Sequence, residues 1–468
     1  MLFHTWLFAV FFAVVCVVYF SLARTKLRVA WLLVASYVFY AAWNPYLLLL
    51  IVYSTALDYV AVAQMDQART QAGKRAWLIA SIVNNLGVLA FFKYANFFID
   101  NTNSVLSLLC SGEQLGDAAS MMPFGWKYIL PVGISFFTFQ SMSYSIDFYR
   151  GQIRRERSFI RFAAFVSLFP QLVAGPIERA SSLLPQLNQI PKPCLKQFSD
   201  GASLFLTGLF KKVALANYLA VYVERVYETP ADFGAPALML ATFCFAWQIY
   251  FDFSGYTDMA RGVALVMGFR LMRNFNHPYL ANGIGDFWGR WHISLSTWFR
   301  DYLYVPLGGS RCGPWRTWRN LLIVFVVSGF WHGANWTFVV WGALHAAGAI
   351  ATRALESADW YRNRVPLFMK RLWVFLFVCF AWVFFRAESM DDALVVIRGI
   401  FAGVWEDPAC PAMMLLLILA VWCYQWMKDS RFKTVLDPAP VKIAMSVGMI
   451  LYLVVAASGG GAFIYFQF

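Results

Sequence analysis

Long apolar runs follow one another closely along this chain, from Trp6 to Ala457, with no long polar segment between them. A helix needs about 20 apolar residues to cross the hydrocarbon core of a bilayer, and roughly a dozen runs approach that length. The pattern predicts an all-α polytopic membrane protein with roughly 11–13 transmembrane helices. We find no internal repeat and no low-complexity linker, so residues 1–468 are expected to form a single integral-membrane domain.

Three apolar stretches are unlike plain spanning helices, because Gly, Pro, Ser and charged residues interrupt them: residues 131–149, 162–180 and 291–309. Broken or re-entrant backbone survives at membrane depth only where protein or a water-filled cavity satisfies its polar groups. We therefore expect re-entrant segments around a central tunnel. Residues 320–352 are expected to form two short membrane helices that meet near His332.

The distribution of basic residues predicts how the chain is oriented in the membrane. No basic residue precedes the first apolar run, and no A-x-A-like cleavage pattern is found with it. Arg24, Lys26 and Arg28 follow the run directly. This run is therefore expected to be an anchor, with the N-terminus outside. The same rule places four basic loops in the cytoplasm, at residues 69–75, 150–161, 353–371 and 428–433, and two acid-bearing segments outside, at residues 93–127 and 388–407.

Composition agrees with a membrane location, because hydrophobic residues make up 60% of the 468 positions and charged residues only 13%. The cytoplasmic loops account for most of the formal net charge of +13. No nucleic-acid partner is expected, since it would require a soluble basic face. The eight cysteines show no CxxC pair and no metal-ligand spacing, which predicts free thiols and no metal site.

The chain has five histidines, and their surroundings favour different roles. His4 near the terminus and His277 before a proline are expected to be structural, and His345 among small residues is expected to pack between helices. His292 lies in one of the broken segments. His332 lies in the stretch FVVSGFWHGANWTF, where an ionisable group is expensive unless it is partnered or used. From these residues alone, a structural and a catalytic role for His332 are equally supported.

Proton abstraction is the chemistry that best fits a buried imidazole at position 332. Desolvation keeps such a group neutral near pH 7, so it is available as a base. No further His, Cys or carboxylate ligand adjoins it, which disfavours a metal site. Ser328 lies one turn away, but no nucleophile-elbow pattern surrounds it. General-base activation of an acceptor hydroxyl is the simplest hypothesis.

The strings WHISLSTWFRDYLYVPLGG and SGFWHGANWTFVVWGALH resemble the paired histidine motifs of membrane-bound O-acyltransferases (MBOAT). PVGISFFTFQSMSYSIDFYRG, LFPQLVAGPIER and QIYFDFSGYTDMARGVALVMGF resemble the branch that contains the bacterial alginate O-acetylases and cellulose-acetylation proteins. The similarity is clearest over a core of about residues 44–385. It implies that His332 is the catalytic histidine. It also implies that His292 occupies the second site position, where many members carry Asn.

The resemblance implies tilted helices around a tunnel that links the two faces of a bacterial inner membrane. An acyl thioester, most simply acetyl-CoA, would enter from the cytoplasm, with no bound cofactor. The acetyl group would pass to hydroxyls of a secreted exopolysaccharide of the alginate or cellulose type. Transfer would be direct or through an exported acetyl-carrying or acetyl-transferring protein. A polysaccharide synthesis and secretion complex and membrane lipids are the other implied partners.

Other candidate site residues have two interpretations each. Asp252 and Asp258 would orient a site histidine, or else cap a helix or satisfy broken backbone. Basic residues at the cytoplasmic face would bind the phosphates of coenzyme A, or else serve topology and contact lipid headgroups. The basic residues are Arg311, Arg316 and Arg319. Trp291 and Trp331 would line the tunnel, or else belong to an interfacial belt. Ser328 and Asn335 are further candidates for the tunnel or its support.

Other function classes stay open at this point. Peptidoglycan or teichoic acid would serve as an alternative acceptor for an acyl group. A transporter or flippase would also have broken helices and polar groups near the membrane midplane, although such proteins usually show repeated halves. A non-catalytic subunit of a polysaccharide secretion complex would fit the topology without needing His332. Acyl turnover separates these alternatives.

Overall fold

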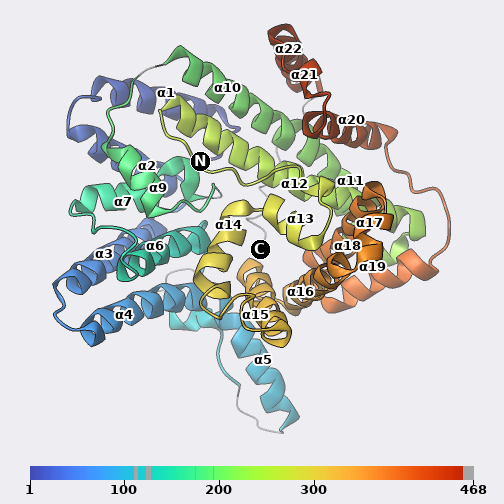
Figure 1. Cartoon of the computed structure of the whole chain (residues 1–468), viewed down its shortest axis with the longest axis horizontal. Helices are drawn as coiled ribbons and strands as arrows, with labels where there is room; N and C mark the ends of the chain where they lie inside the picture. The colour runs from blue at the N-terminus through green and yellow to red at the C-terminus, as the bar shows by residue number, and fades with distance from the viewer. Residues whose placement is uncertain (110–113, 123–127, 174, 193, 457–468) are drawn as a thin grey trace. The chain divides into compact units, whose positions relative to one another are not determined.

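The computed structural model describes residues 1–109, 114–122, 128–173, 175–192 and 194–456, and all regular structure within these residues is helical (Figure 1). Seven helical segments in the described chain are long and apolar enough to cross a membrane, and three shorter apolar helices accompany them. The prediction of an all-α polytopic protein is confirmed. The span count of roughly 11–13 stays a prediction, because short and broken segments also enter bilayers. Cys110, Lys127 and Ala457 lie outside the described residues.

Contacts divide the chain into two compact units, which comprise Met1–Ser199 with Val263–Leu271, and Asp200–Gly262 with Met272–Phe468. The first unit contains α1 (Trp6–Ser21), α2 (Leu27–Ala41), α3 (Pro45–Gln67), α4 (Gln71–Leu89), α5 (Ala95–Leu108), α6 (Ile134–Tyr149), α7 (Phe159–Ser167), α8 (Phe169–Leu172) and α9 (Ala180–Asn188). In the second unit lie most of α10 (Leu195–Leu209) and α12 (Ala235–Val266), together with α11 (Asn217–Glu228), α13 (Ile284–Arg290), α14 (Ile293–Phe299), α15 (Pro314–His332), α16 (Trp336–Ser357), α17 (Asp359–Arg364), α18 (Leu367–Arg386), α19 (Met390–Ala402), α20 (Ala412–Asp429), α21 (Lys433–Leu436) and α22 (Ala439–Ala456).

Local sequence explains where many of these helices begin. Asn44 caps α3, because its side-chain oxygen accepts hydrogen bonds from the first-turn amides of Tyr46 and Leu47, and Pro45 occupies the first helical position. Thr70 caps α4 in the same way through the amide of Gly73. These caps set the first residues of α3 and α4.

Two of the three stretches expected to be broken are broken. Residues 162–180 contain the end of α7, the four-residue α8 and an irregular segment before α9. Residues 291–309 contain only the two-turn α14, the π-helical turn Arg300–Tyr304 and a glycine turn. The expectation is wrong for most of 131–149, because α6 is continuous from Ile134 to Tyr149. The serines of α6 and Gln140 are buried. The polar residues in this stretch therefore lie inside the first unit and do not interrupt the helix.

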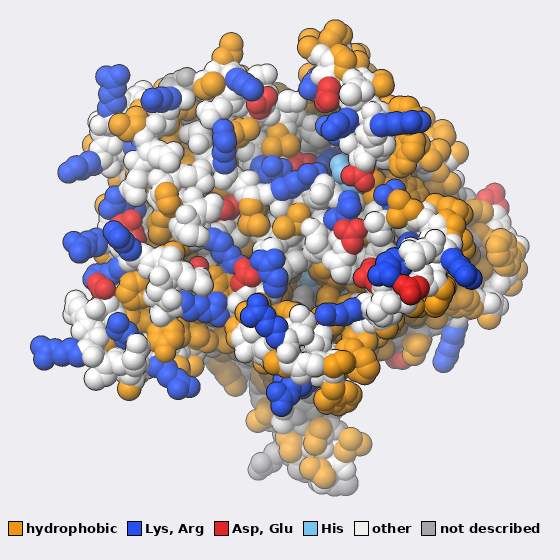
Figure 2. Space-filling model, viewed as in Figure 1, with side chains coloured by type: hydrophobic (Ala, Val, Ile, Leu, Met, Phe, Trp, Pro, Cys, Tyr) orange, Lys and Arg blue, Asp and Glu red, His pale blue; other side chains and the backbone are white. Residues whose placement is uncertain are grey.

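Large apolar side chains remain exposed on many helices, as Figure 2 shows for one face. Trp6 on α1 is 89% exposed and Trp373 on α18 is 64% exposed. Soluble proteins rarely expose such continuous apolar surface, so these side chains are expected to face lipid. The many Lys and Arg side chains on the viewed face in Figure 2 are also solvent-accessible.

The second unit brings its helices together through glycines. A side chain at Gly208 on α10 would lie 2.5 Å from the carbonyl oxygen of Gly255 on α12, and one at Gly262 would lie 2.6 Å from that of Gly201. The two pairs share a seven-residue spacing, which lets the backbones of α10 and α12 approach closely over two turns. Close approach of this kind is typical of helices that pack inside membranes.

Candidate active site

His332 is the last residue of α15, at the turn that separates α15 from α16. Asn335 begins α16, because its Oδ1 accepts a hydrogen bond of 3.1 Å from the amide of Thr337. Its Nδ2 donates a 2.8 Å hydrogen bond to the carbonyl oxygen of Glu388, which anchors the turn to the segment after α18. The expected break between two helices near His332 is confirmed.

Glycines hold α15 and α16 in a close hairpin behind this turn. A side chain at Gly329 would lie 2.1 Å from the carbonyl oxygen of Phe338, and one at Gly342 would lie 2.3 Å from that of Phe325. Neither position therefore accepts a larger residue without separating the helices. The hairpin fixes the position of His332 along the axis of the neighbouring helix α16.

The imidazole of His332 is buried, with 4% of the residue exposed, and aromatic rings surround it. Its ring centroid lies 5.1 Å from that of Trp341 at an interplanar angle of 86° and 5.2 Å from that of Phe385. Trp331, its neighbour in sequence, contacts it at 4.9 Å. The ring edges and faces restrict how the imidazole turns, and they limit the access of water to it.

His292 is fully buried and begins the short helix α14 in the left-handed backbone region, with φ 42° and ψ 55°. Such a conformation costs a non-glycine residue about 1–3 kcal/mol and persists only where the surroundings impose it. Asn274 imposes it here. Its backbone oxygen accepts a 3.0 Å hydrogen bond from the amide of Ile293, and its Oδ1 accepts one of 3.2 Å from the amide of Ser294.

The two histidines both contact one tryptophan. The ring of His292 lies 4.7 Å from that of Phe253 on α12, nearly perpendicular to it, and 6.1 Å from that of Trp331. Trp331 also contacts His332. Residues that are 40 positions apart in sequence are thus joined through a single indole.

A small cavity of about 80 Å³ lies between α14 and α15. Ser328, one turn before His332, and Leu295, one turn after His292, both line it. The remaining lining residues are mainly apolar: Trp288, Ser296, Phe299, Val324 and Phe325. The predicted proximity of Ser328 to the site is supported, and its role in a tunnel stays a prediction.

Trp291, the remaining aromatic candidate, is 1% exposed and packs against Trp382 with ring centroids 5.1 Å apart. It also contacts Phe275 at 5.0 Å. The side chain is therefore part of the buried aromatic packing beside His292. An interfacial belt does not explain a tryptophan buried to this degree, whereas packing next to the site does.

Asp252 and Asp258 of α12 each bind a lysine. Asp252 Oδ1 lies 2.6 Å from Lys212 Nζ, and both side chains are 3% exposed. Asp258 Oδ2 accepts a 2.7 Å hydrogen bond from Lys211 Nζ, and its Oδ1 lies 3.3 Å from Arg261. The two lysines follow one another on the π-helical turn Phe210–Ala216. These ion pairs give both carboxylates a partner that neither sequence interpretation named, and their proposed effect on a histidine stays a prediction.

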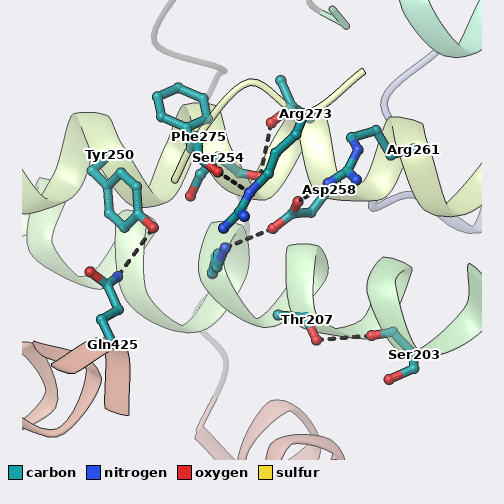
Figure 3. A network of polar contacts seen from close by, with 11 residues as sticks. Ser203, Thr207, Tyr250, Ser254, Asp258, Arg261, Arg273, Phe275 and Gln425 are labelled. Atoms are coloured by element: carbon teal, nitrogen blue, oxygen red, sulfur yellow. Dashed lines mark hydrogen bonds and ion pairs between the residues drawn. The ribbon is translucent and has the colours of Figure 1, made fainter. Parts of the chain in front are cut away.

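Figure 3 shows the surroundings of Asp258 at the partly exposed end of this network. Arg261 lies on the same helix as Asp258, and the side chain of Arg273 reaches the same region from the segment that crosses α12. Further along α12, the hydroxyl of Tyr250 accepts a 3.1 Å hydrogen bond from Nε2 of Gln425. The polar groups thus continue along one side of α12.

The three arginines proposed to bind phosphate are exposed and lie near the start of α15. Arg319 donates a 3.0 Å hydrogen bond to Oδ1 of the buried Asn320. Nδ2 of Asn320 donates to the carbonyl oxygens of Leu307 and Gly309, at 3.1 and 3.0 Å. Arg311 follows Gly308 and Gly309, which both have positive φ. The arrangement holds a glycine turn beside exposed cations, and phosphate binding by them stays a prediction.

Two of the other histidines, His345 and His277, occupy structural positions. His345 is fully buried, and its Nδ1 accepts a 3.3 Å hydrogen bond from Nε1 of Trp288. Its ring also contacts Trp341 at 4.7 Å. His277 adopts φ 48° at the start of a short 3₁₀ helix. Helix packing for His345 and a turn role for His277 are both confirmed.

Sequence reasoning missed several rings that form the site. Phe253, Trp341 and Phe385 contact the two histidines but were not among the candidates. A helical-spacing signal existed only for Trp341, which lies four residues before His345 in the same predicted helix.

In the described residues no group of three His, Cys, Asp or Glu side chains is placed to hold a metal ion.

A sequence model of the MBOAT, membrane-bound O-acyltransferase family, matches residues 150–390, which include both histidines and more than half of the chain. The chain belongs to this family. It is a multi-pass membrane protein and an acyltransferase, as its resemblance to the family implied. The roles of His292 and His332 within the family reaction stay predictions.

The chain is similar to several proteins named for the transfer of acyl groups. The chain is 41% identical over 413 residues to the "probable alginate O-acetylase AlgI" of Pseudomonas aeruginosa, covering 87% of this chain and 76% of that protein. It is 38% identical over 396 residues to the peptidoglycan O-acetyltransferase of Helicobacter pylori, covering 79% and 73%. It is 28% identical over 281 residues to the teichoic acid D-alanyltransferase of Bacillus subtilis, covering 55% and 69%. The MBOAT chain described here is accordingly a membrane O-acetyltransferase.

Proposed function

We propose that this chain moves an acetyl group from acetyl-CoA in the cytoplasm to hydroxyls of a secreted exopolysaccharide, with His332 as the general base. The observation that carries the proposal is the contact of His292 and His332 with Trp331 inside the family region. It places two ionisable groups together in a water-poor aromatic environment. Buried ionisable residues in membrane proteins are functional-site hypotheses by default.

The chemistry needs one base and a site that excludes water. The acceptor oxygen attacks the thioester carbonyl carbon, the C–S bond breaks, and the hydroxyl proton passes to His332 and then to the leaving thiolate. Water would compete with the acceptor and hydrolyse the thioester, so a site lined by Trp331, Trp341 and Phe385 suits the reaction. The cavity of about 80 Å³ between α14 and α15 suits an acyl group as small as acetyl.

Sequence similarity supports an alginate-like acceptor, and a cellulose-like acceptor stays part of the proposal. Identity is 41% to an alginate O-acetylase, compared with 28% to a teichoic acid D-alanyltransferase. Acetyl transfer to a polymer outside the cell requires a route across the inner membrane. We infer that an exported acetyl-carrying or acetyl-transferring protein receives the group there, next to a polysaccharide synthesis and secretion complex.

Peptidoglycan is the second candidate acceptor, because the chain is 38% identical to a peptidoglycan O-acetyltransferase. A single experiment separates the two. Cells of a host that lacks its own O-acetylases would express wild-type protein or His332→Gln with the neighbouring genes, and ester-linked acetate would be measured on exopolysaccharide and on peptidoglycan. Acetate on exopolysaccharide that depends on His332 supports the proposal, and acetate confined to peptidoglycan overturns the acceptor assignment.

The proposal includes an orientation, with the N-terminus outside and the donor site in the cytoplasm. Reporter tags at residues 72, 156 and 360 lie in three of the predicted cytoplasmic loops, and a tag at residue 400 tests the outer face. Cytoplasmic signals at the first three sites and an outside signal at the fourth support the orientation. An outside signal at residue 156 contradicts it.

A further inference from the structure

A second buried polar cluster lies in the first unit, on α3, α4 and α6, which pack against one another (Figure 1). At its centre is Asp58 on α3, a helix long and apolar enough to span a membrane. Asp58 has no exposed surface. We define the Asp58 cluster as Asp58 with the polar side chains around it: Ser54, Thr55, Ser81, Asn85, Thr138, Ser141 and Ser145.

Neutral donors from two helices bind both carboxylate oxygens of Asp58. Ser81 Oγ donates a 2.5 Å hydrogen bond to Oδ1, and Ser141 Oγ donates to Oδ2. Nδ2 of Asn85 lies 3.0 and 2.8 Å from the two oxygens. The hydroxyl of Ser54 donates to Oδ1 of Asn85 at 3.1 Å, which fixes the amide with its nitrogen toward the carboxylate.

Hydrogen bonds of this kind stabilise an ionised carboxylate but do not remove its charge. A buried charge in an apolar medium is so costly that such a group is neutralised or paired. In the described part of the chain no ion pair includes Asp58, and its hydrogen-bond partners are all uncharged. The second unit pairs its own buried carboxylate, Asp252, with Lys212. A positive charge for Asp58 must therefore come from outside the side chains that contact it.

Two unsatisfied hydroxyls lie on the same helices, each one turn before a residue of the Asp58–Ser141 hydrogen bond. Oγ1 of Thr55 and Oγ1 of Thr138 are buried, each in a residue that is 1% exposed, and neither makes a hydrogen bond within the described structure. Thr55 precedes Asp58 by three residues on α3, and Thr138 precedes Ser141 by three residues on α6. Residues three apart share a helix face.

The two hydroxyls belong to one layer because α3 and α6 run in the same direction. At one end, Tyr40, just before α3, donates a hydrogen bond to the carbonyl oxygen of Val132, just before α6. At the other end, Arg155, beyond α6, lies 3.5 Å from Asp66 near the end of α3. Thr55 and Thr138 therefore lie one turn from the contact between Asp58 and Ser141, on the same side of it.

We propose that Asp58, Thr55, Thr138 and Ser141 form an intramembrane binding site for a monovalent alkali cation such as Na⁺. Hard cations bind carboxylate and hydroxyl oxygens, which are the polar atoms that these four side chains offer. One carboxylate balances one positive charge, whereas a divalent cation would leave a net charge in the membrane. The cation satisfies the two threonine hydroxyls and neutralises Asp58 at once.

Binding at this site holds α3 and α6 together, so occupancy stabilises the folded protein. The test is thermal unfolding of purified protein in detergent at fixed pH and ionic strength, with NaCl replaced stepwise by choline chloride. The unfolding midpoint of the wild-type protein should rise with Na⁺ concentration. Saturable binding of radioactive sodium to the same preparation gives an independent readout.

Variants assign the effect to the site. Asp58→Asn keeps the shape of the side chain but removes the charge, so it should unfold at the same temperature with or without Na⁺ and bind no radioactive sodium. Thr55→Val and Thr138→Val should shift the midpoint dependence to higher Na⁺ concentrations. Ser143→Ala is the matched control and should respond like wild type, because Ser143 is equally buried on α6 but donates to the carbonyl oxygen of Gln140.

Three outcomes overturn the proposal. The first is a wild-type midpoint that does not change with Na⁺. The second is a Na⁺ response that persists in Asp58→Asn. The third is a midpoint that depends on pH but not on Na⁺, which assigns a bound proton to Asp58 instead. None of these readouts uses acetyl transfer, so the result is independent of the proposed enzymatic function.

Discussion

The imidazole of His292 and the indole of Trp331 are in contact, with ring centroids 6.1 Å apart. The same indole contacts His332, with ring centroids 4.9 Å apart. A substitution at either histidine can therefore shift Trp331 and so alter the packing of the other histidine. His292 also packs against Phe253, with ring centroids 4.7 Å apart. The two family histidines thus form one packed aromatic assembly, and their functional roles can be separated only by substitutions that preserve the packing.

Replacing His332 by glutamine tests the general base. The amide keeps a similar reach and hydrogen-bonding capacity but is not a useful base, so acetyl transfer should fall by roughly 10²–10⁴, or about 3–5.5 kcal/mol in activation free energy. Membrane insertion and protein abundance should stay near wild type. The measurement is turnover of radiolabelled acetyl-CoA by purified protein, with abundance from quantitative blotting. Near-normal turnover by His332→Gln would exclude the mechanism.

His345→Gln is the matched control for a structural histidine. Its imidazole accepts a hydrogen bond from Trp288 and packs against Trp341, so its loss should reduce the amount of folded protein. Glutamine can still accept the hydrogen bond from Trp288, so the lost stability comes from the packing of the ring against Trp341. Activity per folded molecule should therefore fall much less than in His332→Gln. A selective loss of turnover with normal folding would instead place His345 in the catalytic machinery.

His292→Asn should retain more activity than His332→Gln. Position 292 requires a left-handed backbone, which asparagine adopts more readily than most residues, and the asparagine amide still offers hydrogen bonds. His292→Val should be worse than His292→Asn, since a β-branched residue is strained there. Turnover and melting temperature of the three variants would be compared. Equal loss in His292→Asn and His332→Gln would indicate that position 292 also needs a base.

The break at His332 was predictable because Gly333 follows it directly and the helix-capping Asn335 lies two residues further on. The shared contact of His332 and His292 with Trp331 was not, because the left-handed turn at His292 depends on Asn274, which is 18 residues away and carries no local signal. Asp58 also lies within an apolar run, so its ionisable side chain is a functional candidate for the same reason as the histidines. Its partners Ser81 and Ser141 are 23 and 83 residues away in sequence, so the cluster around it carries no local signal.

Separating the buried pair of Lys212 and Asp252 should destabilise the protein strongly. Asp252→Ala leaves the lysine charge buried without this partner, and breaking such a pair typically costs about 3–5 kcal/mol. A double variant, Lys212→Met with Asp252→Leu, should recover most of the lost stability because it removes both charges. Chemical unfolding in detergent gives the two free-energy differences. If the double variant is no more stable than Asp252→Ala, the charge pair is not the source of the effect.

Neutralising the exposed arginines near the start of α15 tests the donor site. Replacing Arg311, Arg316 and Arg319 together by glutamine should raise the KM for acetyl-CoA if they attract its phosphates. The effect should be largest at low ionic strength, because salt already screens the attraction between exposed charges. The KM would be measured at two salt concentrations, with Arg362→Gln as an exposed control on α17. An unchanged KM at low salt assigns the three arginines to topology and lipid contact.

The cavity between α14 and α15 predicts acyl-chain selectivity. Phe325 lines this cavity, so Phe325→Leu should enlarge it and improve the use of propionyl-CoA relative to acetyl-CoA. One methylene in a pocket changes specificity by about 10–200-fold, which sets the scale of the expected gain. Phe377→Leu is the matched control. Both phenylalanines contact the ring of His345, at 6.2 and 5.8 Å, but Phe377 is not among the lining residues. Competition between the two thioesters gives the ratio of their kcat/KM values directly. If Phe325→Leu and Phe377→Leu change this ratio equally, the effect arises from disturbed packing at His345, and the acyl group does not bind in this cavity.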